Sequence, residues 1–382
     1  MVGLQAVTIT SAFVFGMVLA LLGSIKLALA KRLGIDEARV GGLLAAISLA
    51  LIPMMLLSGV LIDHWGPRVM LIVGSCLTGV GVVGLTVKPS YAWTLAALLL
   101  IGAAGACLST ASTVLMPKAF FPGHPSAALN LGNVFFGLGA LLTPALVDLL
   151  LRILEFRRTM ILLAVVCLIP ALIAAATDRE YLQVDVQEGD LIKVLSDWRI
   201  WLAGAVFLLY MPLEGSVGTW ATTYLTDLGY GTRQAAWLLS GFWLTFLAGR
   251  LLMALLQQQL FDPRVEPWII LILSLLAAVV LGDLAGASSR GNAGLGLLAL
   301  GLIFGPIFPT LVGIVFGLFP HDQGTAYGAM FAIGATGSLF APPLFGAYAR
   351  RTSVQHALRL PMFMALLMVV LSLVLAAVAQ PR

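Results

Sequence analysis

Apolar runs of about 20 residues recur from one end of the chain to the other, separated by short segments that hold most of the charged residues. A helix that crosses a bilayer needs about 20 consecutive apolar residues, and its backbone groups must be hydrogen-bonded within the segment. Each run is therefore predicted to be a membrane-spanning helix. The twelve predicted spans are 6–30, 38–62, 68–88, 90–117, 125–151, 157–177, 198–226, 233–259, 265–286, 291–319, 321–350 and 355–379.

The densest group of charged residues lies at 178–197, near the midpoint of the chain. It predicts an N-terminal six-helix bundle over 1–177, a linker over 178–197 and a C-terminal six-helix bundle over 198–382. The two halves are also similar when shifted by 198 positions: Phe121-Pro122, Gly139 and Pro144 fall on Phe319-Pro320, Gly337 and Pro342. An internal repeat of this kind is typical of carriers whose binding site lies between the two halves.

Composition agrees with an integral membrane protein. Of 382 residues, 60% are hydrophobic and 10% are charged, whereas soluble domains carry roughly 25% charged residues. The net charge of +4 forms no basic run, so nucleic-acid binding is not expected. The three cysteines and four histidines show no metal-binding or catalytic spacing. We expect no enzyme activity, no metal and no cofactor, with energy coming from an ion gradient.

The segment between the second and third predicted spans reads Gly59-Val60-Leu61-Ile62-Asp63-His64-Trp65-Gly66-Pro67-Arg68. It resembles the signature loop of the major facilitator superfamily, Gly-x-Leu-x-Asp-x-x-Gly-x-Arg. The resemblance implies an all-α carrier of twelve transmembrane helices in two pseudo-symmetric six-helix bundles. A Gly turn beside charged residues suits a contact that forms in one carrier state and breaks in the other. Gly59, Asp63, Gly66 and Arg68 are the predicted switch residues, with Asp63 and Arg68 as a charge pair or as members of one.

Two further segments resemble the branch of this superfamily that contains fucose/proton symporters. They are Phe207 to Trp220 in the seventh span and Gly305-Pro306-Ile307-Phe308-Pro309-Thr310 in the tenth. The resemblance implies proton-coupled transport, by alternating access, of a sugar or a similar small polar solute. Two features depart from related carriers: the first span has no acidic residue, and the fourth has no arginine.

Charged residues inside spans are costly and are therefore candidates for function. Glu214 lies near the middle of the seventh span, with Tyr210 one helical turn before it. It is predicted to couple transport to protons or to bind the solute, and a structural hydrogen-bond acceptor is the alternative. Lys26 in the first span could attract an anionic solute, or extend to the membrane surface. Arg250 in the eighth span is interpreted as a pathway charge or as a structural partner of a helix end.

Polar and aromatic residues complete the predicted solute site. Asn130 and Asn133 lie on one face of the fifth span and could bind sugar hydroxyls or bond across helices. Trp220 and Tyr327 could stack on a sugar ring, although aromatic residues also serve as packing or interfacial anchors.

The resemblance places both termini in the cytoplasm, whereas the distribution of Lys and Arg over the loops favours the opposite orientation. Short loops favour a bacterial inner membrane, and we expect a monomer whose partners are the lipid bilayer and a small solute. Two alternatives remain. One is an importer or exporter of organic anions or drugs, with Lys26 as the counter-charge for an anion. The other is a membrane sensor or assembly partner that keeps the fold without transporting.

Overall fold

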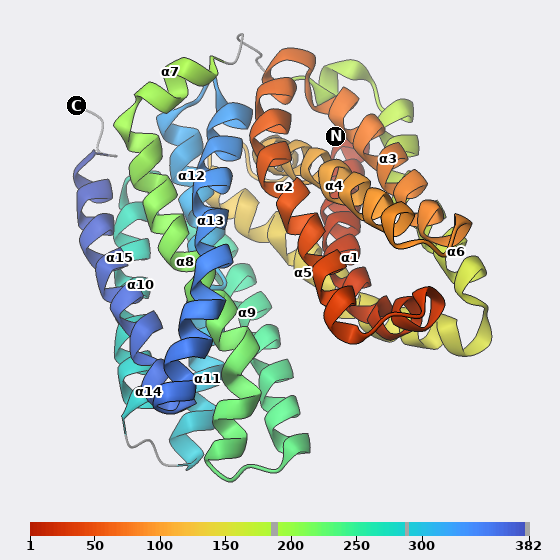
Figure 1. Cartoon of the computed structure of the whole chain (residues 1–382). Coiled ribbons are helices and arrows are strands. Elements are labelled where there is room, and N and C mark those ends of the chain that lie inside the picture. The colour runs from red at the N-terminus through yellow and green to blue at the C-terminus, as the bar shows by residue number, and fades with distance from the viewer. Residues whose placement is uncertain (185–189, 287–289, 379–382) are drawn as a thin grey trace. The chain divides into compact units, whose positions relative to one another are not determined.

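The computed structural model describes residues 1–184, 190–286 and 290–378, and within these ranges every regular element is a helix (Figure 1). Twelve helical segments of the described chain are long and apolar enough to cross a bilayer. The prediction of an all-α protein with twelve spans is therefore confirmed.

The helices follow the order of the predicted spans. The first half contains α1 (Val2–Leu33), α2 (Glu37–Trp65), α3 (Pro67–Val87), α4 (Tyr91–Ala119), α5 (Pro125–Ile153) and α6 (Phe156–Ala176). The linker holds the 3-10 turn η1 (Arg179–Leu182) and the short helix α7 (Leu191–Ser196). The second half contains α8 (Trp198–Asp227), α9 (Thr232–Gln259), η2 (Pro263–Val265), α10 (Glu266–Ala285), α11 (Arg290–Phe304), α12 (Ile307–Leu318), α13 (Gln323–Arg351), α14 (Val354–Ala357) and α15 (Arg359–Val378). The tenth predicted span is thus two helices, α11 and α12.

Local sequence signals set several helix ends. Gly34 ends α1 in the left-handed conformation, with φ of 63°, which glycine adopts without strain. Asp36 begins α2 by accepting a hydrogen bond from the backbone N–H of Arg39. Asp197 caps α8 in the same way through Arg199, and the guanidinium of Arg199 holds the pKa of Asp197 below its usual range.

The chain forms two compact units. The first contains residues 1–123, 132–194 and 319–329, and the second contains 124–131, 195–318 and 330–382. The first residues of α5 therefore belong to the second unit, and the first residues of α13 belong to the first unit. The boundaries at 177 and 198, which rest on the charged linker, stay a prediction.

The same packing pattern occurs in both units. In the first, α1 packs on α6, α2 on α4, and α3 on α6. In the second, α8 packs on α15, α9 on α11, and α10 on α15. These are the matching helix pairs when the six spans of each half are counted in order, as an internal repeat requires.

Glycine allows α1 and α5 to approach closely in the first unit. A Cβ atom at Gly139 would collide with the backbone oxygen of Phe13, and one at Gly16 with the backbone oxygen of Phe136. Backbone atoms cannot move aside as a side-chain tip can. We therefore expect Gly139→Ala to lower the free energy of unfolding by about 1–3 kcal/mol, the usual range for overpacking.

Thermal unfolding in one detergent would measure this effect. Gly23→Ala in α1 is the matched control, because a Cβ there meets no atom within 4 Å. Equal unfolding temperatures for the two variants would contradict the close contact between α1 and α5.

Candidate functional site

The predicted switch loop binds the start of α13 within the first unit. The Asp63 carboxylate, only 4% exposed, accepts hydrogen bonds from the backbone N–H groups of Gly324 at 3.0 Å and Thr325 at 2.7 Å. The first N–H groups of a helix have no partner within the helix, and the helix dipole favours an anion there. Asp63 therefore acts as a cap for a helix that lies more than 250 residues away in sequence.

The other loop residues shape this contact. A Cβ at Gly59 would collide with the backbone oxygen of Gly324. The backbones of α2 and of the start of α13 are therefore in close contact. Gly66 turns the chain between α2 and α3 with φ of 79°. Arg68 donates to the backbone oxygen of Ala175 at 2.8 Å. Asp63 and Arg68 therefore have separate partners here and do not form the predicted pair with each other.

Asp63→Ala is expected to lower the free energy of unfolding by roughly 1–3 kcal/mol, because two buried N–H groups lose their acceptor. Asp63→Asn, which keeps one acceptor oxygen, should have a smaller effect. Thermal unfolding would measure both, with Arg68→Ala as the comparison, because Arg68 lies at the surface and should change stability by no more than about 0.5 kcal/mol. A larger loss from Arg68→Ala than from Asp63→Ala would contradict this assignment.

Two more contacts hold the start of α13 in the first unit. Lys193 of α7 pairs with Asp322, the residue before the helix, at 3.3 Å. The Tyr327 hydroxyl hydrogen-bonds Ser109 of α4 at 3.1 Å, and Tyr327 is 1% exposed. Tyr327 thus has a structural contact in this state, and its predicted role in stacking on a solute stays a prediction.

A second polar cluster, which we call the α5 cluster, forms at the start of α5 within the second unit. Ser126 donates to the Glu266 carboxylate at 2.6 Å, and the Asn130 amide donates to Gln257 at 2.9 Å. Gln257 in turn donates to the Thr310 hydroxyl at 3.1 Å. All five side chains are at most 5% exposed. Asn130, which is predicted to bind sugar hydroxyls or to bond across helices, therefore hydrogen-bonds residues of other helices here.

Glu214 lies half-buried in α8, in the middle of a membrane span. Its side chain lies one helical turn after Tyr210 and interacts electrostatically with Tyr210 and with Arg250 of α9. Tyr210 also donates to the backbone oxygen of Phe304 at 2.9 Å, and Arg250 donates through Nε to the backbone oxygen of Gly305 at 3.0 Å. Both carbonyls lie at the break between α11 and α12. We call Tyr210, Glu214 and Arg250 the α8–α9 centre.

The remaining predicted solute residues are Trp220 in the second unit and Lys26 and Asn133 in the first. Trp220 packs its ring on Phe345, with centroids 5.4 Å apart. Lys26 is half-buried in α1, and Asn133 is 8% exposed in the first unit. Within the second unit the structure brings Tyr210 and Glu214 together, and the solute-binding roles of all the predicted residues stay predictions.

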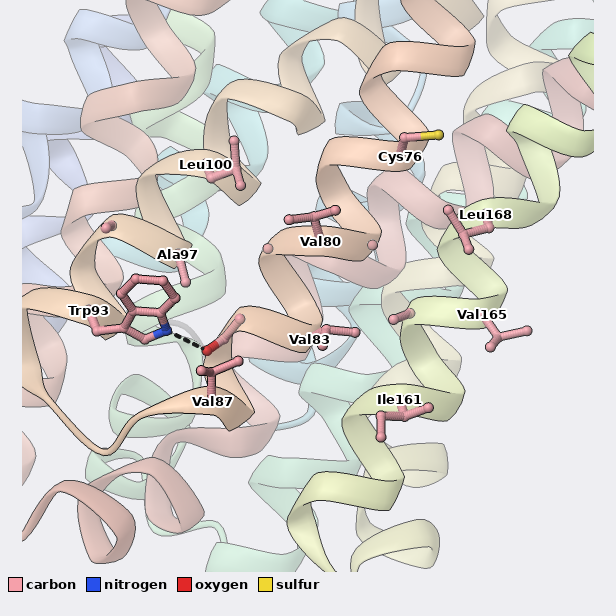
Figure 2. A pocket seen from close by; sticks show the side chains of 15 residues that line it. Cys76, Val80, Val83, Val87, Trp93, Ala97, Leu100, Ile161, Val165 and Leu168 are labelled. Atoms are coloured by element: carbon pink, nitrogen blue, oxygen red, sulfur yellow. Dashed lines mark hydrogen bonds between the residues drawn. The ribbon is translucent and has the colours of Figure 1, made fainter.

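One pocket of the first unit is apolar and lies among α3, α4 and α6 (Figure 2). It has a volume of about 680 Å³, and its lining includes Val80, Val83, Leu100, Ile161 and Val165. The Trp93 indole N–H, shown by the dashed line, is already donated to the backbone oxygen of Gly84 at 2.9 Å. A polar solute would lose its hydrogen bonds with water there and gain few, so this pocket is not the predicted solute site.

Some of the residues in these clusters were not expected from sequence. Glu266 is the first residue of α10, where an acidic residue is ordinary, and Gln257 and Thr310 are polar residues near apolar runs. The sequence predicts Arg250 as an intramembrane charge, but its interaction with Glu214 depends on the packing of α8 and α9. An intramembrane charge was the only sequence signal that could have linked the two.

Comparison with known proteins identifies the family of the chain. Residues 8–342 match the family model described as Major Facilitator Superfamily. An uncharacterised MFS-type transporter of Yersinia pestis is 26% identical over 224 residues, which are 58% of this chain and 57% of the relative. The aligned region therefore spans little more than half of that relative's length.

Solved structures share the fold at low identity. The fucose:proton symporter FucP of E. coli is similar with a TM-score of 0.77 and 18% identity over 98% of both chains. The human organic anion transporter MFSD10 is similar with a TM-score of 0.73 and 18% identity, over 96% of this chain and 99% of that one. Twelve spans, the signature loop and the family match over most of the chain lead to one conclusion: the protein belongs to the Major Facilitator Superfamily of membrane transporters.

Proposed function

We propose that the protein is a secondary active transporter that moves a small polar solute by alternating access, with Glu214 as the group that carries the coupled proton. It acts as a monomer in the lipid bilayer, with both termini in the cytoplasm of a bacterial cell. It uses a proton gradient in place of a cofactor, catalyses no reaction and binds no nucleic acid.

The carrying observation is that Glu214 is a carboxyl group in the middle of a membrane span, with Arg250 as an electrostatic partner. Arg250 is a cation and favours an ionised carboxylate. Removal from water favours the neutral carboxyl group instead. These two opposing influences support a change of protonation at Glu214 during transport.

The cost of charge in the membrane supports the same role. A charged side chain at the centre of a span costs roughly 2.5–3.5 kcal/mol on insertion scales, so a change of protonation at Glu214 changes the energy of the site substantially. A ligand or proton shifts a conformational equilibrium only by its different affinity for the two states. Protonation of Glu214 supplies such a difference.

Two solute classes are candidates. A sugar is the first, because the seventh and tenth spans resemble those of fucose/proton symporters and the fold is that of FucP. An organic anion is the second, because Arg250 places a buried cation beside Glu214. The fold is also shared with a human organic anion transporter.

Thermal stabilisation of the purified protein tests this proposal, because a ligand that binds the folded state raises its apparent stability. The panel contains neutral sugars, organic anions and lipophilic cations, each at pH 5.5 and pH 7.5. We expect stabilisation by a sugar or an anion that is stronger at the lower pH, since proton and solute bind together. Stabilisation by lipophilic cations alone, or a solute response without pH dependence, would contradict it.

A further inference from the structure

The apolar pocket among α3, α4 and α6 has the length of one lipid chain. Cys76 and Val87 of α3 lie near its two ends (Figure 2), and at about 1.5 Å per residue they are about 16 Å apart along the helix. The hydrocarbon core of a bilayer is about 30 Å thick. The pocket therefore extends through about the depth of one leaflet.

The pocket is open at the outer surface of three membrane-spanning helices. Val80 of α3 and Val165 of α6 line it and are 60% and 56% exposed. Gly84 and Ala97 have little or no side chain, which leaves room between α3 and α4. An apolar chain gains contacts with these residues without losing hydrogen bonds to water, whereas a polar group loses them. The lining therefore suits the acyl chain of a lipid.

One end of the pocket lies at the membrane surface and carries cations. Trp93 stands at this end, in the first turn of α4 (Figure 2), and tryptophan is enriched at membrane–water interfaces. Arg158 and Arg157 precede Ile161, which lines the pocket, by three and four residues, so they share its face of α6. Both arginines are exposed.

Arg32 of α1 holds the end of α3 close to the start of α6. It donates to the backbone oxygen of Thr86 at 2.5 Å, and its guanidinium carbon lies 5.5 Å from the centroid of the Phe156 ring. Lys88, which is exposed, directly follows α3. With the two arginines of α6 these residues form a group of four cations, and Glu155 offsets one of the charges. The group is therefore net positive.

We propose that this pocket binds one acyl chain of an anionic phospholipid, whose phosphate group lies against Lys88, Arg157 and Arg158. Guanidinium groups form charge-assisted hydrogen bonds with phosphate oxygens, and basic residues beside membrane helices attract anionic headgroups. A zwitterionic lipid has the same chains, but its headgroup brings a cation of its own. The site therefore prefers anionic lipids, and it does not depend on the role proposed for Glu214.

Native mass spectrometry of the detergent-purified protein measures lipid binding directly. Phosphatidylglycerol and phosphatidylcholine with the same acyl chains are added in separate titrations, and we expect tighter binding of phosphatidylglycerol. In Arg157→Gln/Arg158→Gln its affinity should fall about tenfold or more, because each basic residue near an anionic lipid contributes a factor of about five. Arg350→Gln/Arg351→Gln is the matched control, since these adjacent exposed arginines lie at the end of α13. It should bind phosphatidylglycerol as the unsubstituted protein does.

Filling the pocket tests the acyl chain separately from the headgroup. Val80→Trp places a large ring in the pocket from an exposed position and should also weaken phosphatidylglycerol binding. Val279→Trp on α10, at a position that is 63% exposed and outside this pocket, is its control. An excess of glycerol phosphate, which has the headgroup charge without acyl chains, should not displace the lipid.

Two sets of results would overturn the proposal. Equal affinity for the two lipids, or unchanged phosphatidylglycerol binding in Arg157→Gln/Arg158→Gln, would contradict the headgroup site. Unchanged binding in Val80→Trp, or displacement of the lipid by glycerol phosphate, would contradict the role of the pocket.

Discussion

Arg250→Met is expected to destabilise the protein strongly. The variant removes the buried cation that interacts electrostatically with Glu214, and removing one partner of a buried polar interaction costs roughly 1–3 kcal/mol. The variant also leaves the Gly305 oxygen without the donor that Arg250 provides.

A double-mutant cycle separates the two effects. Glu214→Gln/Arg250→Met lacks the same donor to Gly305 but has no uncompensated charge. We expect it to be more stable than Arg250→Met alone when both are compared by thermal unfolding in one detergent. If the double variant is as unstable as Arg250→Met, the loss comes from the helix break and Glu214 is not the electrostatic partner of Arg250.

Glu214→Gln should abolish solute accumulation driven by a pH gradient. The ratio of internal to external solute concentration should fall at least about tenfold, to the value of 1 expected at equilibrium. Glutamine resembles protonated glutamate but cannot release a proton. The loaded carrier can therefore still change sides, whereas the empty carrier must return with Arg250 beside a side chain that cannot ionise. A barrier higher by about 1.4 kcal/mol slows that return tenfold.

Solute exchange across the membrane of reconstituted vesicles should survive in this variant, because exchange uses only the loaded carrier. Glu155→Gln is the matched control, since Glu155 is an exposed carboxylate between α5 and α6 and should leave both activities unchanged. Loss of exchange together with accumulation would show that Glu214 is needed for solute binding itself.

The fold could be predicted from sequence because the bilayer imposes a simple rule on each segment. Any run that is apolar and about 20 residues long must be a helix, whatever its neighbours are. Proline alone did not reveal which helix is broken: Pro53, Pro144 and Pro212 lie inside continuous helices, whereas the chain breaks at Gly305-Pro306. The break is accompanied by a glycine and by a second proline at 309. Tyr210 and Arg250 supply donors to the backbone oxygens of Phe304 and Gly305 there.

The site could be predicted only where its members are close in sequence. Tyr210 and Glu214 are four residues apart and share a helix face, so their contact follows from helix geometry. The partners of Asp63 lie on α13, and those of Asn130 lie on α9 and α12. Such pairs depend on how helices pack, and single polar residues in apolar runs do not reveal which helix they will meet.

The central claim is that a proton crosses the membrane with the solute through Glu214. Its most direct test uses vesicles that contain the reconstituted protein and a pH indicator, to which a solute that stabilises the purified protein is added on one side. We predict that solute entry acidifies the vesicle interior in the unsubstituted protein and does not do so in Glu214→Gln. Solute entry without a pH change, or an equal pH change in the variant, would contradict the account.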